Sequence, residues 1–308
     1  MTDSMIAAHL AAGTILLYYG GEFVVKGASH IARLLGISRI VVGLTVVAFG
    51  TSLPELVVSL VAATSGKESI AVGNVIGSNI ANVGLIIGLS CSLFYVSVVG
   101  KRFLKDLNIM MLASVLFIVI MLDGRVERWE GIVLFSGIII YTFYRLYSGK
   151  KETDVHEEFG SVGLNAGFLV FGILGLYFGS NIFVEGAVSL ARSFGIAEIV
   201  IGMTIVAYGT SLPELATSLV AAFRKEGDIS LGNIIGSNLF NLMAVIGPVA
   251  IIAPLTAERS LLSFELPVMI AFSVALYPLV RVSGTVSRRY ASVLLLAYLS
   301  FIISLFVI

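Results

Sequence analysis

The chain has little charge, one cysteine and only three histidines. Of its 308 residues, 12% are charged and 58% are hydrophobic, whereas soluble domains carry about 25% charged residues. A soluble core of this length cannot bury so much apolar side chain, so the composition predicts a polytopic helical membrane protein. The lone Cys91 excludes an internal disulfide and a cysteine metal cluster, and the scattered histidines do not form a ligand set.

Long apolar runs divide the chain into candidate membrane helices. A helix needs about 17–25 apolar residues to cross a bilayer, and runs of that length give ten candidate spans. The third is too long for one straight crossing and contains three glycines, so we expect it to be broken or strongly tilted. A short polar linker, 149–160, separates a first five-helix repeat, 1–148, from a second, 161–308. The spans are 5–25, 39–63, 69–98, 106–122, 131–148, 162–185, 198–223, 229–254, 263–281 and 289–308.

The two halves repeat one another. Residues 18–90 align with 177–249 at a constant offset of 159 and without a gap. Within this alignment GLTVVAFGTSLPEL, starting at Gly43, returns as GMTIVAYGTSLPEL, starting at Gly202. An odd number of crossings per half turns the second copy upside down in the membrane. We therefore expect an all-α membrane protein of two inverted five-helix repeats, with helices 2, 3, 7 and 8 broken or kinked around a central ion site.

The distribution of basic residues predicts the orientation. With the N-terminus outside, 14 of the 19 lysines and arginines fall on the cytoplasmic side, as the positive-inside rule requires. Equivalent connectors of the two halves also differ in sign, because Lys26 aligns with Glu185 and Arg39 with Glu198. The prediction is a multi-pass protein of the cell membrane with both termini outside.

Each copy of the long motif places one carboxylate, Glu55 or Glu214, in the middle of an apolar span. A charge at mid-bilayer costs at least ~2.5–3.5 kcal/mol, so two at equivalent positions indicate function. Pro54 and Pro213 cannot donate to the carbonyl four residues earlier, so each helix should kink near its Gly-Thr-Ser and turn main-chain carbonyls inward. The residues on one helix face are Ala48, Thr51, Ser52 and Glu55, and Ala207, Thr210, Ser211 and Glu214.

A second repeated motif, GNVIGSN at 73–79 and GNIIGSN at 232–238, adds further oxygen atoms. Its glycines are spaced as GxxxG, which allows helices to approach closely. That spacing alone indicates packing, and a proline alone indicates a kink, but their duplication in register with the carboxylates favours function. The polar stripes are Asn74, Ser78 and Asn82, and Asn233, Ser237 and Asn241.

These side chains supply only hard oxygen ligands. Such ligands suit Ca²⁺, which takes 6–8 oxygens, or Na⁺, and do not suit soft transition metals. Two ionised glutamates balance one Ca²⁺ or hold several monovalent ions, and an exchanger needs that competition. Two carboxylates in a poorly solvated cavity should titrate as a coupled pair, so protons should compete with Ca²⁺ as the pH falls.

The paired GTSLPEL and GNxIGSN motifs resemble the α-repeats of the cation/calcium antiporter superfamily, in particular its prokaryotic sodium/calcium exchanger branch. The resemblance covers nearly the whole chain. It implies ten helices, no cofactor and no enzyme activity, and exchange of external Na⁺ for Ca²⁺ by alternating access, with the first and sixth helices sliding against the other eight. It assigns the ion ligands to the carbonyls of Ala48 and Ala207 and to the side chains of Thr51, Ser52, Glu55, Ser78, Asn82, Thr210, Ser211, Glu214, Ser237 and Asn241.

One position departs from the family pattern. The second stripe often ends in aspartate in the family, whereas here it ends in Asn241. This weakens the case for a K⁺-dependent exchanger, whose members carry acids at both stripe ends. The linker 149–160 has no room for the large calcium-sensing domains of animal exchangers. The expected partners are Na⁺, Ca²⁺ and the lipid bilayer, with no nucleic acid or protein partner and a functional monomer.

Two other functions stay open. A proton/calcium antiporter would share the fold and the site, although the hydroxyls at 52, 78, 211 and 237 favour Na⁺. A cation channel is a weaker alternative, because sealed midplane glutamates and inverted halves favour alternating access. An intramembrane enzyme is remote, since no His or Lys base lies beside the serines and threonines.

Overall fold

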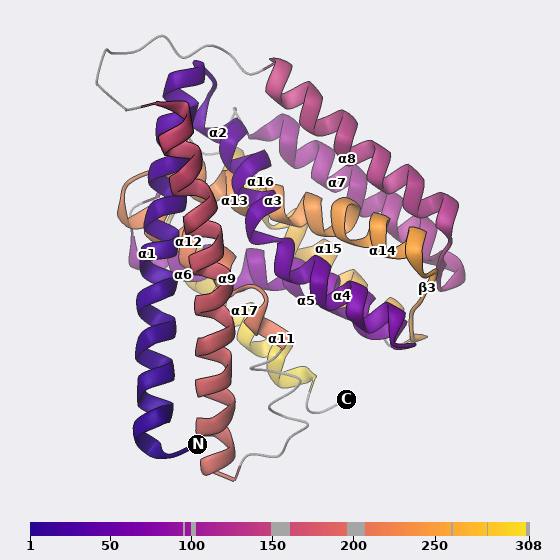
Figure 1. Ribbon diagram of the computed structural model, residues 1–308. Helices are drawn as coiled ribbons and strands as arrows, with labels where there is room; N and C mark the ends of the chain where they lie inside the picture. The colour runs from indigo at the N-terminus through magenta and orange to yellow at the C-terminus, as the bar shows by residue number, and fades with distance from the viewer. Residues whose placement is uncertain are drawn as a thin grey trace.

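The computed structural model describes residues 1–94, 96–99, 103–148, 161–195, 207–259, 261–281 and 283–305, and it is almost entirely helical (Figure 1). The predicted linker and residues 198–206 of the seventh predicted span lie outside this part. The first half contains α1 (Asp3–Leu35), α2 (Arg39–Val42), η1 (Gly43–Val47), α3 (Ala48–Thr51), α4 (Leu53–Thr64), α5 (Glu68–Ala81), η2 (Asn82–Ile87), α6 (Gly88–Leu93), β1 (Ser97–Val99), α7 (Leu104–Ile120), η4 (Met121–Asp123), β2 (Arg125–Val126) and α8 (Arg128–Ser148). The second contains α9 (Val162–Ser193), α11 (Ala207–Gly209), α12 (Leu212–Phe223), α13 (Gly227–Phe240), η6 (Asn241–Val245), α14 (Ile246–Ile252), β3 (Leu255–Thr256), η7 (Leu261–Glu265), α15 (Leu266–Val274), α16 (Leu276–Arg281), β4 (Ser283–Thr285) and α17 (Arg288–Ser304).

The predicted all-α membrane class is confirmed. In the described part of the chain, six helices are long and apolar enough to cross a membrane, or seven if the bent pair 39–51 and 53–64 counts as one span. Helix forms most of each predicted span in the part of the chain that the structure describes, and the number ten stays a prediction. The first helix runs ten residues beyond the predicted end at residue 25, because polar residues continue it past the apolar run.

The four irregular helices deviate in two different ways. The second and seventh are interrupted at Ser52 and Ser211. The third and eighth each run as one 26-residue helix, in which the π-helical turns η2 and η6 replace regular α-helix. These turns begin at Asn82 and Asn241, and π-helical turns occur frequently at functional sites. The third helix ends at Leu93 rather than 98, and β1 follows it.

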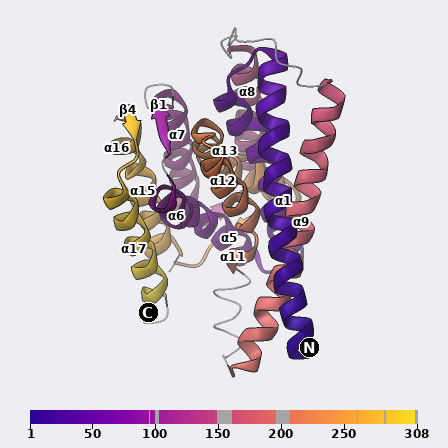
Figure 2. The same cartoon turned by 90° about the vertical axis from the view of Figure 1, so that its left-hand side faces the viewer.

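The long helices α1 and α9 lie side by side at one edge of the molecule in both views (Figures 1 and 2). Both begin with an equivalent hydroxyl cap, since Thr2 Oγ1 accepts from Met5 N (3.4 Å) and Ser161 Oγ accepts from Leu164 N (3.2 Å). Their buried apolar residues form a separate cluster with residues of α2, η1, α12 and α13. The remaining helices share the main hydrophobic core.

A seam of glycines joins α1 to α9. A Cβ at Gly20 would lie 2.8 Å from Leu176 N, and one at Gly172 would lie 2.7 Å from Val24 N, so the two backbones touch directly. Gly13 lies against Phe183 and Gly27 against Asn165, so the helices run antiparallel. The seam glycines are spaced by seven residues and repeat at the 159-residue offset: Gly13, Gly20 and Gly27 in α1, and Gly172, Gly179 and Gly186 in α9.

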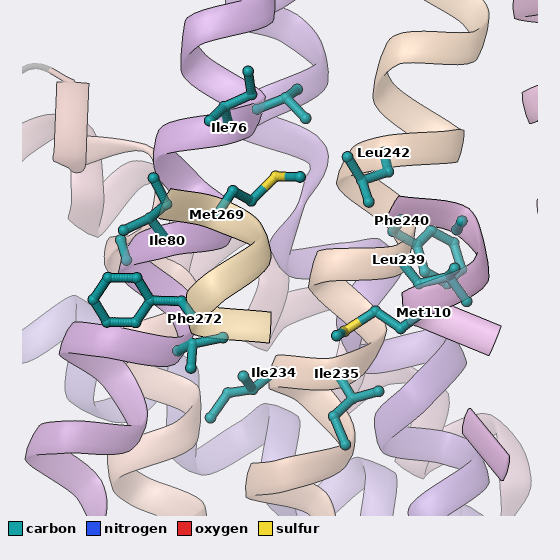
Figure 3. Close-up of a cluster of buried hydrophobic side chains, with 14 of the residues drawn as sticks. Ile76, Ile80, Met110, Ile234, Ile235, Leu239, Phe240, Leu242, Met269 and Phe272 are labelled. Carbon is teal, nitrogen blue, oxygen red and sulfur yellow. The ribbon is translucent and has the colours of Figure 1, made fainter. Parts of the chain in front are cut away.

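The predicted close approach of the GNxIGSN glycines is seen clearly in the second copy. A Cβ at Gly236 would lie 2.7 Å from both Leu44 O and Ala48 Cβ, so α13 packs tightly against η1 and α3 of the second predicted span. In the first copy, a Cβ at Gly73 would meet the Leu261 side chain at an ordinary 3.5 Å. The other faces of α5 and α13 pack into the main core, where Ile76, Ile80, Ile234, Ile235 and Met269 gather with neighbouring side chains (Figure 3).

A buried ion pair joins α7 to α8. The Asp106 side chain is inaccessible to solvent and lies 2.9 Å from Arg145 Nε, while Tyr141 Oη donates to it at 3.0 Å. Replacing Arg145 by methionine removes the balancing charge and should cost about 3–5 kcal/mol of stability. We expect a clearly lower unfolding temperature for Arg145→Met in detergent. The matched control is Arg128→Met, at the exposed opposite end of the same helix; equal unfolding temperatures for the two variants would contradict this role.

Candidate ion-binding site

Both midplane carboxylates are completely buried and occupy equivalent positions. Glu55 lies in the first turn of α4 and Glu214 in the first turn of α12. Each helix starts after a serine that leaves helical geometry (ψ 5° at both Ser52 and Ser211), with the proline in the first turn, where its missing N–H costs nothing. The bend between Arg39–Thr51 and Leu53–Thr64 is 41°. The predicted kink therefore lies at the Gly-Thr-Ser segment.

Each carboxylate receives a hydrogen bond from the opposite half of the chain. Ser211 Oγ donates to Glu55 Oε1 at 3.2 Å, and Ser52 Oγ donates to Glu214 Oε1, also at 3.2 Å. Ser78 Oγ lies 3.4 Å from Glu55 Oε1 and 3.1 Å from Ser211 Oγ. Because each serine lies one turn before the glutamate of its own half, these bonds bring both carboxylates to one site.

The threonines bond to asparagines of the other half. Thr51 Oγ1 donates to Asn233 Oδ1 at 3.1 Å, and the equivalent Thr210 Oγ1 donates to Asn74 Oδ1 at 3.4 Å. Thr51 Oγ1 also lies 3.4 Å from Ser237 Oγ. Each asparagine donates to a serine of its own half, Ser59 (3.0 Å) or Ser218 (3.1 Å). Asn74 and Asn233 thus hold the threonines in place.

The main-chain carbonyls differ from the expectation. Ala48 O accepts from Ser52 N at 3.0 Å and lies 3.3 Å from Thr51 Oγ1, so the kink does not free it. In the second copy, Ser211 N bonds instead to Tyr208 O at 3.1 Å. The carbonyl that Pro213 leaves without its helical donor, Gly209 O, accepts from Ser180 Oγ of α9 at 2.6 Å. Pro213 therefore does free the Gly209 carbonyl from its helical hydrogen bond, but the Ser180 hydroxyl of α9 donates to that carbonyl instead.

Four buried oxygens of the predicted site residues have no hydrogen-bond partner. They come from equivalent residues of the two halves: Glu55 Oε2 and Glu214 Oε2, and Asn82 Oδ1 and Asn241 Oδ1. Unpaired buried acceptors are rare in folded proteins, because each loses its solvation without compensation. Within the described residues, no group of three His, Cys, Asp or Glu side chains could hold a metal ion. The available ligands are therefore carboxylate, amide and hydroxyl oxygens, which suit a hard cation.

Hydrogen bonds join several of the predicted site residues, namely Ser52 with Glu214, Ser78 and Ser211 with Glu55, and Thr51 with Ser237. Asn82 and Asn241 bond instead to Asn238 and Asn79, and the role of all these residues as ion ligands stays a prediction. The side chains of Thr51, Ser52 and Ser78 are buried, as are those of Asn82, Ser211, Ser237 and Asn241. Thr210 is half-buried, and only the backbone of Ala207 is described. The supporting residues Ser59, Ser180 and Ser218 were not predicted. Ser59 and Ser218 open the duplicated segment SLVAA, which is a signal that the sequence does carry.

Comparison with known proteins agrees with this arrangement. The family profile described as "Sodium/calcium exchanger protein" matches residues 5–147 and 164–307. The chain belongs to the sodium/calcium exchanger family. This member of the family is 36% identical over 302 residues to the putative antiporter CaxA of Alkalimonas amylolytica, covering 94% of this chain and 95% of that one. It is 35% identical over 342 residues to the sodium/calcium exchanger MaX1 of Methanosarcina acetivorans, covering 97% and 98%.

Solved structures of the family share the fold. The sodium-calcium exchanger NCX_Mj, soaked with 10 mM Na⁺ and zero Ca²⁺, matches with a TM-score of 0.87 at 35% identity, covering 98% of this chain and 99% of that one. Membership in the sodium/calcium exchanger family makes this chain a multi-pass membrane transporter for cation/calcium antiport rather than an enzyme.

Proposed function

We propose that this member of the family exchanges Na⁺ for Ca²⁺ across the cell membrane by alternating access, as a monomer, with both ions bound between its halves. The observation that carries the proposal is the set of four buried, unpartnered oxygens on Glu55, Glu214, Asn82 and Asn241. A cation supplies the partner that each of them lacks. The proposed ligands are Ala48 and Ala207 through their carbonyls, and Thr51, Ser52, Glu55, Ser78, Asn82, Thr210, Ser211, Glu214, Ser237 and Asn241.

The hydrogen bonds of the site support competition between the two ions. In the proposal Glu55 and Glu214 bridge one Ca²⁺, together with the threonines and the main-chain carbonyls. Na⁺ ions use overlapping positions beside Ser52, Ser78, Ser211 and Ser237. Three of these serines already contact a carboxylate, so the two ion sets share oxygens. Filling both would leave excess positive charge in a low-dielectric pocket.

Contacts between connectors support two inverted repeats, and the positive-inside rule supports the placement of the N-terminus outside. Strand β1 pairs with β4, and β2 pairs with β3. The alternating topology assigns the first pair to the cytoplasmic side and the second to the external side. Arg39 forms an ion pair with Glu226, and both belong to predicted cytoplasmic connectors. Each of these contacts therefore joins connectors assigned to one side of the membrane.

The packing of α1 and α9 supports their proposed sliding. These helices are the first and sixth predicted spans, and they share a hydrophobic cluster distinct from the main core. Their contact combines close glycine approaches with side-chain packing, such as the stacking of Phe23 of α1 on Phe168 of α9. A pair of helices held mainly to each other can move as a unit, while the ligands on helices 2, 3, 7 and 8 stay in the core.

A gradient experiment distinguishes Na⁺ from H⁺ coupling. We expect proteoliposomes loaded with Na⁺ and diluted into Na⁺-free buffer to take up ⁴⁵Ca at least about tenfold faster than Na⁺-free vesicles with an acidic interior. The reason is that the hydroxyls at 52, 78, 211 and 237 favour Na⁺. A voltage clamp with valinomycin and K⁺, and empty liposomes, serve as controls. Equal uptake under the pH gradient alone would instead identify a proton/calcium antiporter, and single-channel currents would identify a channel.

A further inference from the structure

A second pair of buried asparagines lies directly behind the proposed ligands. Asn79 and Asn238 end the two copies of GNxIGSN and are related by the 159-residue offset. They are 2% and 1% exposed, on α5 and α13. Neither belongs to the proposed ligand set. Their side chains bond across the interface between the two halves rather than within one helix.

Hydrogen bonds to main-chain carbonyls fix the orientation of both amides. Asn79 Nδ2 donates to Asn238 O at 3.2 Å, and Asn238 Nδ2 donates to Asn79 O at 3.5 Å. A carbonyl oxygen can only accept, so each amide must direct its NH₂ group towards the backbone. Consequently the Oδ1 atom of each asparagine faces the other way and acts as an acceptor.

These two acceptors orient the amides of the proposed ligands. Asn238 Oδ1 accepts from Asn82 Nδ2 at 2.9 Å, and Asn79 Oδ1 accepts from Asn241 Nδ2 at 3.1 Å. With their NH₂ groups held in this way, Asn82 and Asn241 direct their Oδ1 atoms away from the pair. Those are the two amide oxygens that have no donor.

We propose that Asn79 and Asn238 are positioning residues that hold the carbonyl oxygens of Asn241 and Asn82 towards the transported cation. This rests on the proposed function, in which Asn82 and Asn241 bind the ion. The two ends of an amide have nearly the same shape but opposite polarity. A freed amide can rotate and present NH₂, which repels a cation, so the residue behind the ligand sets its polarity.

The same bonds explain why asparagine suits position 241 in this chain. Aspartate there would place a carboxylate oxygen against Asn79 Oδ1, and both are acceptors. Asn79 cannot reverse its amide without giving up its bond to Asn238 O. The pair Asn79 and Asn238 therefore favours a donor at both stripe ends, which an amide or a protonated acid supplies and an ionised carboxylate does not.

Two double-mutant cycles test this role. We expect Asn79→Ala to weaken Ca²⁺ binding by purified protein about 10-fold to 100-fold, as the loss of a supporting partner does. Asn241→Ala should weaken it by a similar factor, and Asn79→Ala/Asn241→Ala should bind no more weakly than either single variant, because the first change acts only through the second residue. Asn79→Ala/Asn82→Ala is the control, in which the two factors should multiply. Calorimetric titration measures the affinities, and size-exclusion chromatography confirms folded protein.

The outcomes separate this inference from the proposed function. Multiplying losses in Asn79→Ala/Asn241→Ala would overturn the positioning role, because a purely structural residue acts independently of the ligand. Unchanged affinity in both Asn82→Ala and Asn241→Ala would instead remove these residues from the proposed ligand set. The mirror cycle, Asn238→Ala with Asn82→Ala against Asn238→Ala with Asn241→Ala, decides the question if Asn79→Ala does not fold.

Discussion

Glu55→Gln and Glu214→Gln should each abolish Na⁺-driven Ca²⁺ uptake. Each change removes one of the two negative charges that balance Ca²⁺ and turns one carboxylate oxygen into an NH₂ donor. Both side chains are fully buried, so water cannot replace the lost ligand. Losing one partner of a buried charged contact costs about 3–5 kcal/mol, so uptake should fall at least about a hundredfold. Initial rates of ⁴⁵Ca uptake into proteoliposomes measure the effect.

The matched control is Glu185→Gln. This glutamate also lies on a membrane helix, α9, but its side chain is 68% exposed and forms a long 3.9 Å ion-pair contact with His9. Exposed pairs contribute little, so uptake should stay near the wild-type rate. Near-normal uptake in both Glu55→Gln and Glu214→Gln would remove the carboxylates from the transport site.

Gly236→Ala should be nearly as damaging, although it adds only one methyl group. The new Cβ would lie 2.7 Å from Leu44 O and from Ala48 Cβ, and backbone cannot move aside like the end of a side chain. Helix α13 must shift away from helix 2, which costs about 1–3 kcal/mol and displaces Ser237 from Thr51. We expect a lower unfolding temperature and at least about a tenfold loss of uptake.

The control for this change is Gly167→Ala in α9, where no described atom lies within 4 Å of the added methyl group. Alanine is the better helix former by roughly 1 kcal/mol, so Gly167→Ala should unfold at the same temperature or higher. Wild-type uptake by folded Gly236→Ala protein would show that the close approach at this glycine is not needed to align the site.

The sequence carried the fold class and marked the candidate site residues, whose role stays a prediction, because the pattern is local and duplicated. Helical spacing alone places Thr51, Ser52 and Glu55 on one face, and Pro54 alone predicts the kink. Spacing cannot tell which helix lies opposite a face. The hydrogen bonds from Ser211 to Glu55 and from Ser52 to Glu214 therefore could not be predicted from the sequence. The same holds for the hydrogen bond that Ser180 donates to Gly209 O.

Another feature was readable but was overlooked. Close helix approach was predicted for GxxxG and is found at Gly236, but a seam of glycines also joins α1 to α9. Its seven-residue spacing is visible in the printed sequence at Gly13, Gly20 and Gly27. The role of Asn79 differs in kind, since only side-chain geometry shows that its amide orients Asn241.

The bond from Ser180 to Gly209 has a consequence for the resting state. Its counterpart in the first half would join residue 21 to Gly50, but residue 21 is a glycine and has no hydroxyl. A conformation that interchanged the environments of the two halves would lose this bond and gain none in return. One hydrogen bond is worth about 1 kcal/mol, so this asymmetry alone changes the equilibrium constant between the two access states roughly fivefold. With equal ion concentrations on the two sides, the protein would therefore stand open to one side more often than to the other.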